Sequence, residues 1–316
     1  MSDITLETFA VEVEERIKGI LGDGYDTEVR TVSKNNGIIL TGISICRTGE
    51  RISPVFYLND YYSQKADMEI DAGDIAGKIA DCLHSHGDLP VAAQISVSCL
   101  HDFEQVKDKV LFKLINTRSN ERLLRQIPSI PYLDLSIVFY LYMSEDDEAM
   151  MTAQIRNEHL ALWEVDAQTL YRNALDNMQR SMPAVIKSMK EIMDGLRKAC
   201  EEEWGGEEQD EETQDGEEME DTPFYVLSTA SGINGAACML YPGLIAGFAE
   251  QRGSDIIILP SSLHEVLLME DTGGMDCGAL TELVKCINAT EVPPEDILSG
   301  NIYRYERTCN KVTIVA

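Results

Sequence analysis

The sequence predicts an α+β protein with antiparallel sheets and packed helices, in two parts joined by an acidic disordered tether. Strand-like and helix-like runs alternate without a regular βαβ rhythm, and hydrophobic residues make up 44% of the 316-residue chain, as in globular proteins. The segment 201–221 holds 13 acidic and no basic residues, so it repels itself and buries too little apolar area to fold. We therefore expect domains at 1–200 and 223–316 with a linker at 201–222.

The N-terminal part begins with apolar residues at spacings of three and four. This pattern predicts an amphipathic helix from about Thr5 to Leu21. Two β-rich runs, 27–33 and 38–46, flank the turn sequence Asn35-Asn36-Gly37 and predict a hairpin. A further run at 52–58 can extend the hairpin into a small antiparallel sheet.

Further elements follow along the N-terminal part. Helical spacing predicts a helix between Asp71 and His84, and the apolar runs 109–115 and 133–143 predict strands, the second of them central. Asp166 is a residue that caps helices, and it precedes a buried stripe in the next helix. Pro183 is expected to open another helix, because a first-turn amide needs no partner.

The C-terminal part mixes short strands with helices. After Pro242 we expect one helix, and Pro260 should end a buried strand. The predicted strands are 224–227, 255–259, 265–269, 303–307 and 312–315, and the predicted helices are 244–251 and about 279–287.

The charge of the chain excludes several classes of function. Its 55 Asp and Glu against 26 Lys and Arg give a net charge of −29, which repels nucleic acids and anionic lipid surfaces. We see no signal peptide and no apolar run long enough to span a membrane. We therefore expect a cytoplasmic protein that binds neither nucleic acid nor membrane.

Eight scattered cysteines without CxxC spacing indicate reduced thiols. One group is a candidate for zinc, because Cys and His are ligands that zinc accepts. Its spacing matches no standard zinc finger, and polar residues at a helix end and in a loop are the alternative. The group consists of Cys82, His84, His86, Cys99 and His101.

The segment after the buried strand 255–259 is a candidate catalytic site. A hydroxyl, an imidazole and a carboxylate there are the types needed for a nucleophile, a base and an orienting group. Adjacent residues of a strand point to opposite faces, so Ser262 and His264 can share a face that Glu265 does not. A serine turn with a structural histidine is the alternative. The candidates are Ser261, Ser262, His264 and Glu265.

A glycine turn, Asn234-Gly235, precedes Cys238. Backbone amides before a helix can hold an anion. The segment lacks both the P-loop lysine and the dinucleotide glycine pattern, so a tight packing turn is the alternative. We expect no cofactor.

Several segments of the sequence are similar to those of a known family: KLINTRSNERLL, IPYLDLSIVFYLY, IRNEHLALWEVDAQTLYRNALDNM, NGAACMLYPG and IIILPSSLHEVLLMED. With them, the chain resembles an uncharacterised family of bacterial proteins, a domain of unknown function recurrent in gut anaerobes. The resemblance implies no particular reaction, cofactor or partner. The motif residues it carries over are Asn234, Gly235, Tyr241, Pro242, Pro260, Ser261, Ser262, His264 and Glu265.

Two functional hypotheses follow from the sequence. The first is a non-enzymatic accessory protein with a protein partner, and a basic partner would suit the acidic segment 201–221. The second is a hydrolase or transferase that uses Ser261 or Ser262 with His264. No group of residues has the spacing of a known catalytic or cofactor site, which favours the first hypothesis.

Overall fold

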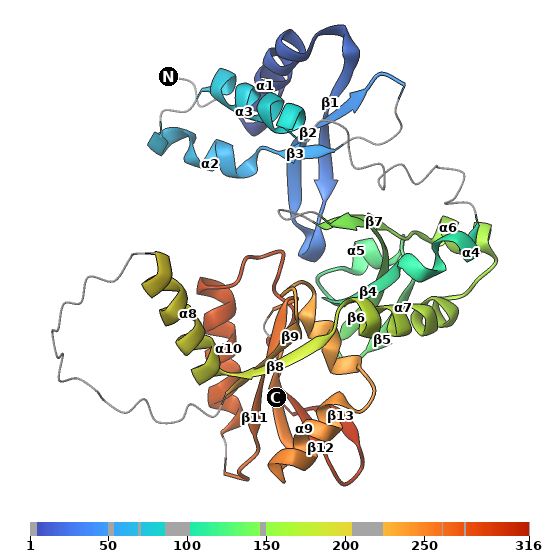
Figure 1. Cartoon of the computed structure of the whole chain (residues 1–316), viewed down its shortest axis with the longest axis vertical. Helices are drawn as coiled ribbons and strands as arrows, with labels where there is room; N and C mark the ends of the chain where they lie inside the picture. Colours follow the sequence, from blue (N-terminus) through green and yellow to red (C-terminus); the bar gives the residue numbers. More distant parts are fainter. Residues whose placement is uncertain are drawn as a thin grey trace, which may run out of the picture. The chain divides into compact units, whose positions relative to one another are not determined.

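The fold is α+β, as the sequence predicts, and the described residues form three antiparallel sheets with helices packed on them (Figure 1). The chain divides into unit 1, Met1–Gln105 with Met143–Thr152, and unit 2, Val106–Tyr142 with Ala153–Ala316. The structure is a computed structural model, and it describes residues 5–49, 54–68, 71–85, 102–145, 150–203, 224–260, 262–274 and 276–315.

These units differ from the division expected at the acidic segment. β8 (Ala184–Ser188), which precedes that segment, pairs with β9 (Tyr225–Thr229), which follows it. Both sides of the segment therefore belong to unit 2, and 1–200 is not one compact body. Residues 201–203 end the helix α8 (Met189–Glu203), and residues 204–222 lie outside the described residues, so the tether remains a prediction.

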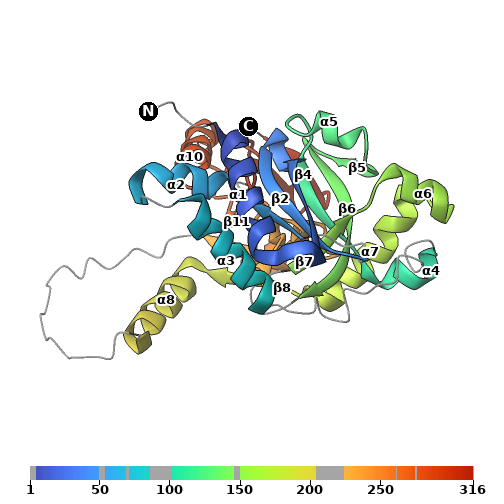
Figure 2. The ribbon, with the colours of Figure 1, turned by 90° about the horizontal axis from the view of Figure 1, so that it is seen from above.

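Unit 1 packs helices on a small sheet. Thr5 caps α1, because its hydroxyl accepts a hydrogen bond from the N–H of Thr8. α1 and α3 lie side by side (Figures 1 and 2), and Phe9, Ile43 and Ile75 meet in the core. The predicted helices and hairpin are confirmed. The elements are α1 (Leu6–Leu21), η1 (Gly22–Gly24), β1 (Tyr25–Ser33), η2 (Asn35–Gly37), β2 (Ile39–Arg47), β3 (Val55–Tyr57), α2 (Asn59–Met68) and α3 (Ala72–Ser85).

The four-stranded sheet has the order β4-β6-β5, and β7 also pairs with β6. β6 is central, as predicted from its apolar residues. Asp166 caps α7 by accepting a hydrogen bond from the N–H of Thr169, and Tyr171 of α7 packs on Phe112 of β4. The elements are α4 (Phe103–Val106), η5 (Lys107–Lys109), β4 (Val110–Asn116), α5 (Glu121–Leu124), β5 (Ser129–Tyr132), β6 (Leu135–Glu145), β7 (Met150–Gln154), α6 (Asn157–Trp163) and α7 (Ala167–Ser181).

The six-stranded sheet has the order β13-β12-β10-β11-β9-β8. Val284 of α10 packs on Ile257 and Met269 on one face, and Phe248 of α9 packs on Tyr225 on the other face. The predicted C-terminal strands and helices are confirmed. The remaining elements are η6 (Gly235–Leu240), α9 (Leu244–Arg252), β10 (Ile256–Leu259), β11 (Glu265–Glu270), α10 (Cys277–Thr290), β12 (Tyr303–Glu306) and β13 (Lys311–Ile314).

The prediction that a helix begins at Pro183 is wrong, because residues 184–188 form β8 and the helix begins at Met189. The N–H and the hydroxyl of Ser188 both donate to Glu191 Oε2, and Ser188 Oγ accepts from the N–H of Glu191. This reciprocal pair is a capping box and fixes the start of α8. β-branched Val185 and Ile186 favour the strand.

Candidate functional site

The ring of His264 lies between two partners that are distant in sequence. Its Nδ1 accepts a hydrogen bond from the N–H of Asn234 at 3.3 Å. Because Nδ1 accepts, Nε2 carries the proton of the neutral ring, and it lies 3.3 Å from Oδ1 of Asp296. The ring is therefore held by a backbone amide on one side and a carboxylate on the other.

Among the described residues of the predicted catalytic group, neither Ser262 nor Glu265 bonds to the ring of His264. Ser262 Oγ accepts a hydrogen bond from the backbone N–H of His264 at 3.0 Å, and Glu265 is exposed at the start of β11. In this arrangement neither ring nitrogen of His264 is left to accept the proton of Ser262. Ser261 lies outside the described residues.

Four of the predicted motif residues are buried, namely Asn234, Gly235, Tyr241 and Pro260. Asn234 is 7% exposed, has a left-handed backbone (φ 52°) and donates from its amide to the hydroxyl of Tyr140. The hydroxyl of Tyr241 donates to the carbonyl of Met182 at 2.8 Å, and burial raises the pKa of Tyr241. The first contact joins the turn after β9 to β6, and the second joins the end of η6 to the end of α7. These motif residues therefore hold unit 2 together.

The remaining motif positions agree with this interpretation. Gly235 lies against Ser228 and the carbonyl of His264, where a Cβ would collide. Pro260 is buried and its carbonyl accepts from the N–H of Ser299, whereas Pro242 is exposed.

The turn at Asn234 continues into the short helix η6, in which Cys238 is fully buried. Burial raises the pKa of the Cys238 thiol to about 11, which makes the thiolate scarce at neutral pH. The structure therefore gives no sign of an activated cysteine at this turn.

The candidate zinc ligands are mostly outside the described residues. Cys82 and His84 lie on α3, and the side chain of His84 is not described. His86, Cys99 and His101 lie outside the described residues. In the part of the chain that is described, no group of three or more His, Cys, Asp or Glu residues could hold a metal ion.

A second region of unit 2 stands out at β8, the outer strand of the six-stranded sheet. The N–H of Met189 donates to the carbonyl of Phe224, and the N–H of Ala230 donates to the carbonyl of Pro183. In an antiparallel ladder these pairs recur at every second residue. The backbone groups of odd-numbered β8 residues therefore point to β9, and those of even-numbered residues point outward.

The outward-pointing residues are Ala184, Ile186 and Ser188. The N–H of Ser188 is bound by Glu191 at 2.7 Å, which closes one end of this edge. For Ala184 and Ile186, no further strand of the described chain pairs with the outward backbone groups. β8 therefore presents a short open edge.

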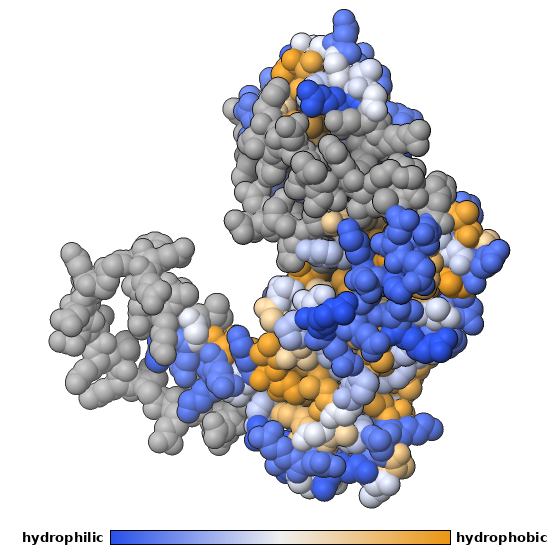
Figure 3. All heavy atoms as spheres, turned by 45° about the vertical axis from the view of Figure 1, so that its right-hand side comes forward, coloured by the Kyte–Doolittle hydropathy of each residue, from blue (hydrophilic) through white to orange (hydrophobic). Residues whose placement is uncertain are grey.

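A cavity lies on each face of the sheet beside this edge. The first, here called the α9 cavity, has a volume of about 470 Å³, and the second, the α8 cavity, about 330 Å³. Ile186 and Ser188 line the first, and Val185 and Lys187 line the second, as the alternation of a strand requires. Apolar side chains are exposed in this part of unit 2, next to α8 (Figure 3).

The α9 cavity contains a cationic side chain. The guanidinium carbon of Arg252 lies 4.2 Å from the ring centroid of Tyr225 and 5.3 Å from that of Phe248. The cavity is also lined by Glu191, Leu244, Gly247 and Gln251. In contrast, the α8 cavity is lined by Ile192, Val226, Ser228 and Glu265, with the 229–232 turn.

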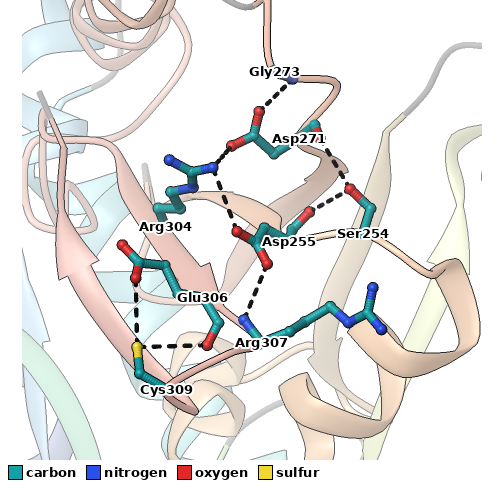
Figure 4. A network of polar contacts seen from close by, with 8 residues as sticks. All are labelled: Ser254, Asp255, Asp271, Gly273, Arg304, Glu306, Arg307 and Cys309. Carbon is teal, nitrogen blue, oxygen red and sulfur yellow. Dashed lines mark hydrogen bonds and ion pairs between the residues drawn. The ribbon is translucent and has the colours of Figure 1, made fainter.

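A separate polar network links the ends of β10, β11 and β12 (Figure 4). Arg304 Nη2 lies 2.7 Å from Asp271 and 3.4 Å from Asp255. Asp271 also accepts from the N–H of Gly273, and Asp255 from the N–H of Arg307. Because each carboxylate here already has donors from the chain itself, the network holds strand ends together and offers no open ligand site.

The fold and these sites define an α+β protein without an assembled Ser-His catalytic group among its described residues. The chain belongs to a family of unknown function (DUF5688), whose model matches residues 6–307. This confirms the family resemblance seen in the sequence. No curated protein and no solved structure matches the chain significantly.

Sequence reasoning missed Asp296 as the partner of His264, and it missed the open edge and Arg252. The pattern Ser188-Met189-Lys190-Glu191 is a capping-box signature. It could have placed the helix start at 189 and the strand before it. No local pattern indicates Asp296, because the contact depends on the fold.

Proposed function

We propose that the protein is a non-enzymatic binding protein that holds an extended peptide segment of a partner protein along β8. The observation that supports this most directly is the open edge at Ala184 and Ile186, with one cavity on each side of it. A peptide that pairs with this edge becomes the seventh strand of the sheet.

The geometry suits this mode of recognition. In an added strand, main-chain hydrogen bonds supply affinity, and side chains point alternately to the two faces of the sheet. Neighbouring residues of the peptide would therefore enter the α9 cavity and the α8 cavity. A short edge with two side-chain pockets favours selective binding of a short motif.

Other features support a binding role in the cytoplasm. Six cysteines of the described residues are free thiols, as is usual in reducing compartments: Cys46, Cys82, Cys238, Cys277, Cys286 and Cys309. No described helix has the length and apolar character needed to cross a bilayer. The net charge of −29 favours a partner that is basic overall and disfavours nucleic acid. The engagement of both ring nitrogens of His264 weighs against the hydrolase alternative.

A peptide selection tests this function. A random peptide library displayed on phage is panned against the purified full-length chain, and enriched peptides are measured by fluorescence anisotropy. Ile186→Pro is the test variant, because it removes an N–H that faces away from β9, a position where an edge strand tolerates proline. Ile186→Ala is the matched control, since it removes the same side chain and keeps the N–H.

We expect Ile186→Pro to weaken binding about tenfold more than Ile186→Ala, which corresponds to the loss of one hydrogen bond. Both variants should melt at similar temperatures. The proposal is wrong if no peptide is enriched, or if the two variants bind the peptides equally. It is also wrong if analytical ultracentrifugation shows a dimer that Ile186→Pro abolishes, because the edge then belongs to a second copy of the chain.

A further inference from the structure

Arg252 in the α9 cavity has no carboxylate partner among the described residues. Its contacts are with the aromatic rings of Tyr225 and Phe248. By comparison, Arg304 lies within 4 Å of two carboxylates. Glu191 also lines the cavity, but its carboxylate accepts from the N–H and the hydroxyl of Ser188. The guanidinium of Arg252 is therefore available to an anion from outside the chain.

The guanidinium of Arg252 is also incompletely satisfied. Its Nε is buried and has no hydrogen-bond acceptor, and a buried donor without an acceptor is costly. The two rings hold the guanidinium by cation–π contacts, which fix its orientation without supplying an acceptor. A carboxylate can accept from a guanidinium through two parallel hydrogen bonds.

We infer that the α9 cavity binds an acidic side chain, Asp or Glu, of the peptide that pairs with β8. The inference rests on the proposed function and names the chemistry of its ligand. The cavity lies on the face of the sheet, beside Ile186 and Ser188, and a paired peptide reaches a face with its side chains. The carboxylate therefore comes from a side chain within the peptide and not from its C-terminus.

The α8 cavity defines the neighbouring position of the peptide. Val185, Val226 and Ile192 supply apolar surface there, and Lys187 and Glu265 also line this cavity with opposite charges. The residue next to the acidic one is therefore expected to be uncharged and to place its apolar atoms on this surface. The net charge of −29 repels further acidic residues. The expected motif is therefore a single acidic residue beside an uncharged one, in a segment that is otherwise neutral or basic.

Gly247 offers a way to block the cavity without disturbing the fold. A Cβ at this position would meet no atom within 4 Å, and the residue lines the cavity from within α9. Gly247→Leu should therefore fill the cavity while α9 stays folded. Gly77→Leu is its control, because Gly77 lies within α3 of unit 1 with equally open surroundings.

Two peptide libraries test the inference with the full-length chain. They are identical except that the fixed central residue is Glu in one and Gln in the other. Affinities of the enriched peptides and of their Glu/Gln counterparts are measured by fluorescence anisotropy. The protein variants are Arg252→Gln, Arg252→Lys and Gly247→Leu, and Arg122→Gln on α5 removes the same charge from an exposed position.

We expect the Glu peptides to bind about tenfold more tightly than their Gln counterparts, and Arg252→Gln to abolish this difference. Arg252→Lys should retain part of the difference in affinity between Glu and Gln peptides. Gly247→Leu should weaken the binding of both kinds of peptide. The controls Arg122→Gln and Gly77→Leu should leave both affinities unchanged. Added salt should reduce the difference in affinity between Glu and Gln peptides, because it screens the attraction between the two charges.

The inference fails if Glu and Gln peptides bind equally, or if Arg252→Gln leaves the preference intact. It also fails if amidation of the peptide C-terminus removes the preference, since the carboxylate is then terminal. In each of these cases a loss of peptide affinity in Ile186→Pro would still indicate strand pairing, so the proposed function would stand without this inference. If no peptide from either library binds, both proposals fail.

Discussion

The hydroxyl of Tyr303 donates a hydrogen bond to the carboxylate of Asp134, 169 positions earlier in the chain. The same carboxylate accepts from the hydroxyl of Ser299 at 2.7 Å and from the amide of Asn301 at 2.9 Å. Asp134 lies between β5 and β6 of the four-stranded sheet, and Tyr303 begins β12 of the six-stranded sheet. These contacts therefore join the two sheets of unit 2.

Removing this carboxylate should destabilise the protein strongly. We expect Asp134→Ala to lower the free energy of unfolding by about 3 kcal/mol, because three donors lose their acceptor. Tyr303→Phe should cost about 1–2 kcal/mol, and urea denaturation measures both. Asp176→Ala, at an exposed position of α7, is the control and should change stability by less than about 0.5 kcal/mol. Equal effects of Asp134→Ala and Asp176→Ala would contradict the role of Asp134.

Stability should fall at alkaline pH because of buried tyrosines. Burial raises the pKa of Tyr140 to about 12, and burial followed by the nearby Tyr171 raises that of Tyr132 to about 12. Well below pH 10, the ordinary pKa of tyrosine, folded and unfolded chains both keep these protons. Between pH 10 and 12 the unfolded chain releases them and the folded chain does not, so the free energy of unfolding falls as pH rises.

Denaturation measured across this pH range checks the prediction. Tyr140→Phe and Tyr132→Phe should each reduce the slope of the free energy of unfolding against pH by the contribution of one proton. A slope that neither substitution changes would show that other groups titrate there.

Two glycines of unit 2 should respond to alanine in opposite ways. At Gly235 a Cβ would lie 2.6 Å from Ser228 Cα and would also collide with the carbonyl of His264, so Gly235→Ala should destabilise by about 2–3 kcal/mol. At Gly247 a Cβ meets nothing, so Gly247→Ala should stabilise by about 0.5–1 kcal/mol, the usual gain inside a helix. Thermal melting measures both changes. If Gly235→Ala raised the melting temperature as Gly247→Ala is expected to do, the close packing at Gly235 would be contradicted.

The cysteines should differ in reactivity in the native protein. Cys286 and Cys309 are exposed and Cys238 is buried, so iodoacetamide should label the first two well before Cys238. Partial desolvation and the Glu306 carboxylate raise the pKa of Cys309, and its Sγ lies 3.4 Å from that carboxylate (Figure 4). Cys286 should therefore react faster than Cys309, and Glu306→Gln should speed up Cys309. Mass spectrometry of labelled peptides gives the rates, and early labelling of Cys238 would contradict its burial.

Elements with strong local signals could be predicted from the sequence. Thr5 and Asp166 mark helix starts with side-chain caps, and the apolar residues of 133–143 place β6 at the centre of its sheet. Residues 184–188 could not be assigned from spacing, because Val185 and Ile186 continue the apolar stripe of α8. Only pairing with β9 decides that they form a strand.

The candidate site could be predicted only in part. The motif residues Asn234 and His264 meet in the structure, although the resemblance assigned them no role. Ser262 and Glu265 are close to His264 in sequence, but the hydroxyl of Ser262 accepts from the backbone N–H of His264 and Glu265 is exposed at the start of β11. The open edge of β8 depends on the order of strands in the sheet, which no local pattern reveals.

The pairing of β8 with β9 makes the acidic segment a connection between two neighbouring strands of one sheet. A chain broken between residues 204 and 223 would therefore yield two pieces that each contribute strands to the same sheet. Such pieces would stay associated through the ladder and the core, so expressing them separately offers a split protein that reassembles. The segment can then be replaced or labelled without cutting the sheet apart.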